Sequence, residues 1–123
     1  MHHAGLPSRE AIIERGLREF REGRFFEAHE VWEELWMVST GPERLSLQGL
    51  IQLAAALVHL GRGRVDPARR LLALALAKFQ DTPDGFAGLS FSLLRRDIAA
   101  AADRLAEGRE IPPAAGLIDL YPA

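Results

Sequence analysis

Cysteine is absent from the 123 residues of the chain. Disulfide bonds, thiolate metal ligands and cysteine nucleophiles are therefore excluded from its fold and chemistry. Asparagine is also absent, and Lys78 is the only lysine, so the other basic side chains of fixed charge are arginines. Loss of thermolabile amides is a feature of heat-adapted proteins, which favours a thermophilic origin, although a GC-rich genome would also favour arginine.

Long apolar runs and a strong excess of one charge are missing as well. The longest apolar stretch, GLIQLAAALVHL (residues 49–60), is too short to span a bilayer. The first ten residues, MHHAGLPSRE, contain no apolar segment of a secretory signal. A net charge of -2 gives no general attraction to nucleic acid or to anionic membranes. We therefore expect a cytoplasmic protein that binds no membrane.

What the sequence does contain is a helical spacing of apolar residues. Hydrophobic residues make up 48% of the chain and charged residues 26%, the balance of a folded globular protein with one core. The apolar spacing is helical nearly throughout, and no segment alternates as a strand does. The sequence therefore predicts an all-α fold of about five helices in a single domain, 1–123, with 1–7 and 109–123 as terminal extensions.

Capping residues and chain breakers predict where each helix begins and ends. The first expected helix follows Ser8, the second begins at Phe25 and the third begins near Pro42. The fourth has Asp66 as N-cap and Pro67 in the first helical position, and the fifth follows Ser90. They end near Gly23, Val38, Leu60, Phe79 and Gly108. The apolar tail residues that should dock on the body are Leu117, Ile118, Leu120 and Tyr121.

An internal repeat appears when the chain is shifted by about 40 residues, the size of a two-helix unit. Residues 23–24 (Gly-Arg) fall on residues 63–64 (Gly-Arg), and Ala28 falls on Ala68. This predicts two related antiparallel helical hairpins with a fifth helix closing the end; chance similarity of amphipathic helices is the alternative. The packing resembles that of tetratricopeptide repeats, without their full consensus.

The most distinctive segment is FFEAHEVWEELW, residues 25–36. On a helix His29 and Glu33 are four residues apart and share a face, whereas Glu30 lies about 100° round from His29. The neighbouring strip carries Trp32 and Trp36. The second hairpin has arginine and alanine where the first has His29 and Glu33, so the hairpin itself does not require this pair.

Three interpretations of the segment remain open. His29, Glu33 and Gln52, from the next helix, could form a buried hydrogen-bonded network. Alternatively, His29 and Glu33 could bind a divalent metal in a hydrolase with Glu30 as general base. HEVWE is one residue short of the H-E-x-x-H zinc motif, and no third ligand is identified. The third interpretation is a ligand or partner pocket that also uses Trp32 and Trp36.

A second cluster, Arg62, Arg64, Arg69 and Arg70, could bind an anion or a nucleic-acid backbone. The negative net charge favours a solvated face instead, in which Arg70 pairs with Glu30, its repeat equivalent. Nucleic acid is therefore not the expected partner.

Together these residues resemble a known family. An aromatic-Glu-x-His-Glu-x-x-Glu-x-x-Trp pattern (residues 26–36) is followed by Gly-x-x-Gln (residues 49–52) and by a Gly-to-Ala segment (residues 63–68). The pattern is similar to that of domain-of-unknown-function family three-hundred-and-nine, and the resemblance covers roughly residues 8–105. It implies a small all-helical protein without an established activity. It also implies one unit made of His29, Glu30, Glu33, Trp36 and Gln52.

The sequence as a whole thus favours a non-enzymatic module that binds a small ligand or a partner protein. The metal-dependent hydrolase and the anion binder are the alternatives. No cofactor is expected unless the divalent metal of the hydrolase interpretation is present. The small size and apolar helices are compatible with a homodimer.

Overall fold

The structure is a computed structural model that describes residues 7–109. Its helices are α1 (Arg9–Arg21), α2 (Phe25–Met37), α3 (Gly41–Gly61), α4 (Val65–Lys78) and α5 (Phe91–Ala106), with a short 3-10 turn, η1 (Phe86–Gly88). No strand occurs within this part of the chain. The all-α class predicted from the apolar spacing is confirmed.

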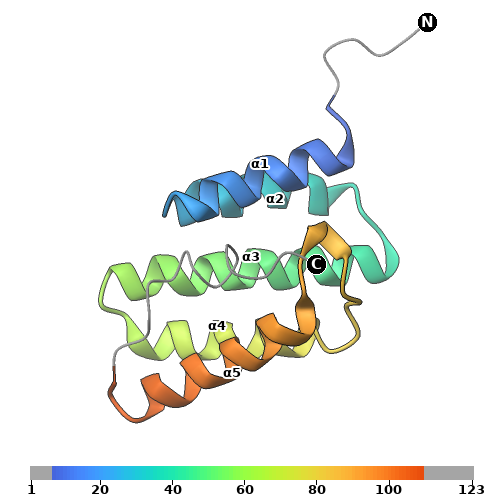
Figure 1. The fold of residues 1–123 in the computed structure, drawn as a ribbon. Coiled ribbons are helices and arrows are strands. Elements are labelled where there is room, and N and C mark those ends of the chain that lie inside the picture. The colour runs from blue at the N-terminus through green and yellow to red at the C-terminus, as the bar shows by residue number, and fades with distance from the viewer. Residues whose placement is uncertain (1–6, 110–123) are drawn as a thin grey trace, which may run out of the picture.

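The helices pack as consecutive antiparallel neighbours. Short turns join the first four helices, whereas residues 79–90, which include η1, join α4 to α5. The main contacts are α1 with α2, α2 with α3, α3 with α4, and α4 with α5. In Figure 1, α3 runs between the α1–α2 pair above it and the α4–α5 pair below it. The longest helix is therefore the one that joins the two halves of the molecule.

Aromatic side chains fill the core in two groups. Phe20 packs edge-on against Phe25 with ring centroids 4.9 Å apart, and Phe79 packs edge-on against Phe91 at 5.0 Å. The apolar residues that recur at helical spacing in α1 and α5 are all buried: Ile13, Leu17 and Phe20 in α1, and Phe91, Leu94, Ile98 and Leu105 in α5. Helical periodicity was thus sufficient to identify these core faces.

The repeat predicted from the sequence is visible in the two turns that close the hairpins. Gly23 and Gly63 both have a left-handed backbone, with φ of 80° and 72°. The following N–H groups, of Arg24 and Arg64, donate to carbonyls five residues back at 2.8 and 2.9 Å. These turns satisfy carbonyls that the ends of α1 and α3 would otherwise leave unpaired. The fold therefore contains the two related hairpins and the closing helix that were predicted.

The predicted start of the fourth helix is wrong. Asp66 is not the N-cap, because α4 begins at Val65 with Arg64 in the cap position. The physical reason is the repeated turn: once Gly63 has turned the chain, Arg64 is already placed so that its carbonyl accepts from the N–H of Ala68 at 3.3 Å. Asp66 and Pro67 lie inside the first turn, where a carboxylate still interacts favourably with the helix dipole.

The caps of the first and last helices differ in origin. Ser8 caps α1 as predicted, since its hydroxyl accepts from the N–H of Ala11 at 3.1 Å. Ser90 occupies the N-cap position of α5 but makes no capping hydrogen bond there. Asp84 does so instead: its carboxylate accepts from the N–H and the hydroxyl of Ser92 at 2.9 and 3.0 Å. The loop before α5 thus supplies the cap from a distance.

No helix within residues 7–109 is long and apolar enough to cross a membrane. The predicted docking of the tail, through Leu117, Ile118, Leu120 and Tyr121, lies outside the described residues.

Candidate functional site

The helix that carries the distinctive segment, α2, has one buried side and one acidic side. Ala28, Trp32 and Leu35 are buried. The four glutamates on the exposed side are Glu27, Glu30, Glu33 and Glu34. His29 and Trp36 are half-buried and lie at the edge of the core side. The sequence-predicted site residues of α2 are therefore divided among core, edge and solvent.

Trp32 belongs to the core and faces α1. It is fully buried, and its indole Nε1 donates to the backbone carbonyl of Ile13 at 3.2 Å. Gly16 lies directly against the indole ring, so that a Cβ there would be 2.6 Å from Cδ1 of Trp32. The structure thus gives Trp32 a packing role and no surface with which to touch a ligand.

His29 and Glu33 share a face, as their spacing predicted. His29 Nε2 lies 3.4 Å from a carboxylate oxygen of Glu33, and their side chains are 27% and 51% exposed. The ring of Phe26 stacks on the imidazole, with centroids 6.2 Å apart and planes inclined by 12°. Both contacts hold the imidazole at the edge of α2, and its second nitrogen, Nδ1, is buried without a hydrogen-bond partner among residues 7–109.

The second tryptophan, Trp36, lies at the edge of α2 that adjoins α3. The guanidinium of Arg44 stands 4.0 Å from the centroid of its ring, a cation–π contact between the two helices. The contact occupies the ring face but not the indole N–H. Trp36 is half-buried with a buried indole N–H, whereas Trp32 is fully buried.

The hydrogen-bonded network predicted for His29, Glu33 and Gln52 does not form, because Gln52 points elsewhere. Arg44 of α3 stacks on Trp36 of α2. Because the two helices are antiparallel, Ile51 of α3 then lies opposite His29 of α2, two helical turns from that contact. Gln52 is turned about 100° further round α3. Its Oε1 and the Nδ1 of His29 accept no hydrogen bond from the described part of the chain.

Two further polar atoms of the same helices lack a partner. Trp36 Nε1 and His59 Nδ1 are buried and make no hydrogen bond within residues 7–109. An unmade hydrogen bond of a buried group costs about 1–3 kcal/mol, so native structures rarely gather several of them. The described residues thus leave four such atoms of α2 and α3 without a hydrogen-bond partner. The sequence identified three of the four residues; His59 was missed because it appeared too far along α3.

A metal would find only part of a site here. Among residues 7–109, no three His, Asp or Glu side chains form a group that could hold a metal ion. His29 and Glu33 are adjacent, but Glu30 is exposed on the solvent side of α2. The pair therefore supplies two ligands, and the third is not provided by the neighbouring helices.

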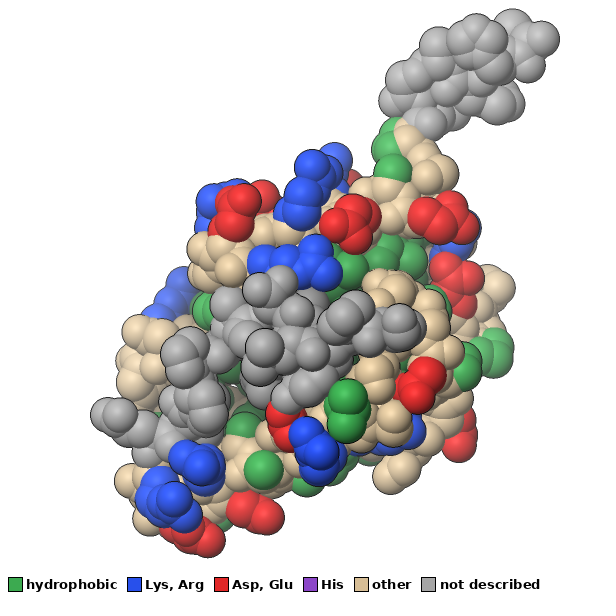
Figure 2. Space-filling model, viewed as in Figure 1, with side chains coloured by type: hydrophobic (Ala, Val, Ile, Leu, Met, Phe, Trp, Pro, Cys, Tyr) green, Lys and Arg blue, Asp and Glu red, His purple; other side chains and the backbone are tan. Residues whose placement is uncertain are grey.

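Two residues of the predicted arginine cluster, Arg69 and Arg70, line a hollow between α4 and α5 together with Asp66 and Asp103, whereas Arg62 and Arg64 do not line it. Arg69 lies 3.8 Å from Asp66, and Arg62, Arg64 and Arg70 are exposed around the turn and the first helical turns of α4. On the face shown in Figure 2, basic and acidic side chains are interspersed over the surface. The predicted pairing of Arg70 with Glu30 inside the chain does not occur, because α3 lies between α2, which carries Glu30, and α4, which carries Arg70.

Two of the hollows that flank the helices adjoin α1, and neither was foreseen from the sequence. One, of about 380 Å³, lies between α1 and α2 and is lined mainly by carboxylates. Its lining residues are Arg15, Glu19, Glu27, Glu30, Val31 and Glu34. The pKa of Glu19 is lowered, chiefly because Arg24 donates hydrogen bonds to its carboxylate at 2.9 and 2.8 Å. This hollow extends the negative charge of α2 towards α1.

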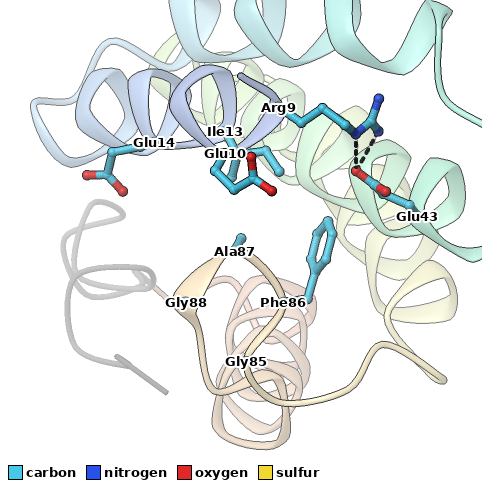
Figure 3. Close-up of a pocket in the computed structure, with 9 residues that line it drawn as sticks. All are labelled: Arg9, Glu10, Ile13, Glu14, Glu43, Gly85, Phe86, Ala87 and Gly88. Atoms are coloured by element: carbon cyan, nitrogen blue, oxygen red, sulfur yellow. Dashed lines mark hydrogen bonds and ion pairs between the residues drawn. The ribbon is translucent and has the colours of Figure 1, made fainter. Parts of the chain in front are cut away.

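The other hollow, of about 580 Å³, lies between α1 and η1. Figure 3 shows Arg9 reaching across to Glu43, with Phe86 and Ala87 of η1 on the opposite wall. Arg9 donates to Glu43 at 2.9 Å and to the hydroxyl of Ser39 at 2.7 Å. These bonds tie the start of α1 to the turn between α2 and α3, which gives the charged wall of this hollow a structural role.

Comparison with known proteins agrees with this picture. The family model described as "Domain of unknown function (DUF309)" matches residues 13–71, from α1 into α4. An "Uncharacterized protein" of Aquifex aeolicus (strain VF5) is 30% identical over 90 residues, which is 72% of this chain and 27% of that protein. The chain thus spans about a quarter of the length of that relative. The resemblance seen in the sequence is confirmed over residues 13–71, which the model of the DUF309 family matches.

Proposed function

We propose that the chain is a non-enzymatic module that binds a partner through the exposed edge of α2 and the adjoining side of α3. This surface, the α2–α3 face, is defined by Phe26, His29, Glu30, Glu33, Trp36 and Gln52. The observation that carries the proposal is the set of unmade hydrogen bonds at His29 Nδ1, Trp36 Nε1 and Gln52 Oε1. These atoms are buried, so a partner that covers the face would pair them by turning the side chains of His29, Trp36 and Gln52 outward.

Apolar and charged side chains on the same face support a protein partner. Phe26 is 50% exposed and Met37, at the end of α2, is 69% exposed. Around them the glutamates of α2 form a negative rim, without a lysine or arginine in the helix. Apolar anchors inside a charged rim are typical of protein interfaces, and the rim favours a partner with positive charge.

The test compares variants of the α2–α3 face with a control variant elsewhere. Proteins captured by the tagged chain are identified and purified, and the Kd of each is measured by calorimetry. The double variant F26S/E30K should weaken the binding of a true partner at least about tenfold, because it removes an anchor and reverses a charge. Leu93→Ser, which alters an exposed leucine of α5, should leave the Kd unchanged. Equal binding by all three proteins would contradict the proposal.

The metal-dependent hydrolase is tested in parallel. Protein purified without a metal-affinity tag is analysed for zinc, iron and manganese, with His29→Ala as the matched variant. Stoichiometric metal that is lost in His29→Ala would replace the partner-binding proposal with the hydrolase, with His29 and Glu33 as ligands and Glu30 as base. Under the proposal made here, neither protein retains stoichiometric metal.

A further inference from the structure

We infer that the partner of the α2–α3 face is a protein that lays a basic, amphipathic helix along α2. The inference rests on the proposed function and deepens it, because it names the chemistry of the partner. The surface that receives this helix is the outer stripe of α2, which we define by Phe26, Glu30, Glu33 and Met37.

The outer stripe lies on the side of α2 that faces away from the core. At about 100° per residue, its four side chains fall within a sector of about 60°. Ala28 and Leu35, which are buried, lie on the opposite side of the helix. All four residues of the stripe are exposed, and the helices packed extensively on α2 within residues 7–109 are α1 and α3. The stripe is therefore open to a partner over its whole length.

The spacing of the outer stripe suits a second helix. Its residues follow one another at intervals of four, three and four, the spacing with which two α-helices pack side by side along a common seam. Phe26 and Met37 stand at the two ends, about 16 Å apart along the axis. They are 50% and 69% exposed, so burial of both against a second helix removes apolar surface from water and favours association.

The centre of the stripe carries negative charge that no arginine or lysine of the described chain neutralises. Glu30 forms no ion pair with any of residues 7–109. Glu33 lies 3.4 Å from His29, which is charged only when it is protonated. The two carboxylates thus need basic side chains opposite them, at the two central positions of the partner helix.

The same charges reject other occupants of the stripe. Two copies of α2 packed along it would place glutamates against glutamates, and such like-charge contacts oppose association. Nucleic acids and anionic membranes are repelled for the same reason. Charge complementarity therefore selects a different protein, whose docking helix carries arginine or lysine between apolar ends.

The hollow between α1 and α2 offers room for one of these basic side chains. It lies beside the stripe, and Glu30 lines it together with Glu27 and Val31. Glu27, like Glu30, forms no ion pair with a described residue. A long basic side chain from the partner can place its apolar stem on Val31 and its charged end between the two carboxylates.

The test is a selection of displayed helical peptides on the full chain. The peptides are randomised at four positions spaced by four, three and four residues. Those enriched should carry arginine or lysine at the two central positions and large apolar residues at the two outer ones.

Binding of the enriched peptides to variants is then measured by fluorescence anisotropy. Glu30→Lys should raise the Kd at least about tenfold, because it places like charges in contact. Glu10→Lys, the same change on an exposed glutamate of α1, should bind like the wild type. Peptides with glutamate at the two central positions should bind the double variant E30K/E33K more tightly than the wild type.

Two results would overturn the inference. One is enrichment of peptides that are uncharged or acidic at the central positions; the other is a Kd that Glu30→Lys leaves unchanged. If Phe26→Ser still weakened the binding of such peptides, the proposed function would stand without this partner. If neither change affected any selected peptide, both proposals would fail. Circular dichroism of each variant shows that it is folded before its binding is judged.

Discussion

Gly16→Ala should destabilise the protein, because the indole ring of Trp32 lies directly against Gly16 of α1. In the interior of an exposed helix, alanine is favoured over glycine by about 0.5–1 kcal/mol. At position 16 the new Cβ would lie 2.6 Å from Cδ1 of Trp32 and closer still to Nε1. The indole cannot move aside freely, since it is fully buried and donates to the carbonyl of Ile13 at 3.2 Å.

The magnitude follows from these opposing terms. Overpacking a filled core costs about 1–3 kcal/mol, and leaving a buried N–H without its acceptor costs about 1–3 kcal/mol. The helix-propensity gain offsets about 1 kcal/mol of this at most. The two costs less this gain should lower the free energy of unfolding of Gly16→Ala by about 1–5 kcal/mol. Urea denaturation followed by far-UV circular dichroism measures the difference, with an unchanged m-value.

Gly61→Ala is the matched control, because nothing lies within 4 Å of a Cβ placed there at the end of α3. It should be neutral or slightly stabilising. In a Trp32→Phe background, which removes the indole edge nearest Gly16, the cost of Gly16→Ala should fall by at least about 1 kcal/mol. The reasoning is refuted if Gly16→Ala stabilises the protein as Gly61→Ala does, or if the two changes are additive.

Three further changes test the caps and the polar atoms. The carboxylate of Asp84 has a lowered pKa, chiefly because it accepts from the N–H of Ser92, so its stabilising effect is present at neutral pH and lost as pH falls through its folded-state pKa. Asp84→Ala should therefore lower the free energy of unfolding at neutral pH, and this loss should shrink in acid. Urea titrations at several pH values measure the loss, with Asp81→Ala as the control variant. A loss that does not depend on pH would contradict the prediction. Gln52→Leu, measured on dilute protein, should leave the free energy of unfolding unchanged or slightly raised, because Oε1 has no hydrogen-bond partner in the described part of the chain. A loss of about 1–3 kcal/mol would instead support the hydrogen-bonded network. Arg9→Ala should lower stability by about 1 kcal/mol in thermal unfolding, because it removes the bonds to Glu43 and Ser39; Glu10→Ala is the control, and equal melting temperatures would show that the tie is dispensable.

Local features of the sequence were sufficient for the helices and for most of their ends. Leu17 and Phe20 recur at the helical period and are buried, because a helix presents such positions on one side. Gly23 and Gly63 were found as breaks, since a left-handed backbone favours glycine. The start of α4 was misplaced because the Asp-Pro rule for helix starts competed with this turn, and the turn, which repeats that of the first hairpin, prevailed.

The candidate site could be located but not assembled from the sequence. Spacing alone placed His29 beside Glu33, because both lie on one helix. Whether Gln52 reaches them depends on how α3 is rotated against α2, and a rotation of one residue, about 100°, removed the network. Sequence could not distinguish Trp32 from Trp36 either, since the choice between core and edge depends on which side of α2 receives α1.

The sequence by itself therefore determined the all-α class, the repeated hairpin and the helix that carries the site. Each depends on residues near one another in the chain, whose periodicity and turn preferences act locally. Only the tertiary structure decided that Asp84 caps α5 and that four polar atoms of α2 and α3 find no hydrogen-bond partner among residues 7–109. These depend on the rotation and offset of packed helices, which many side chains set together and no single segment encodes.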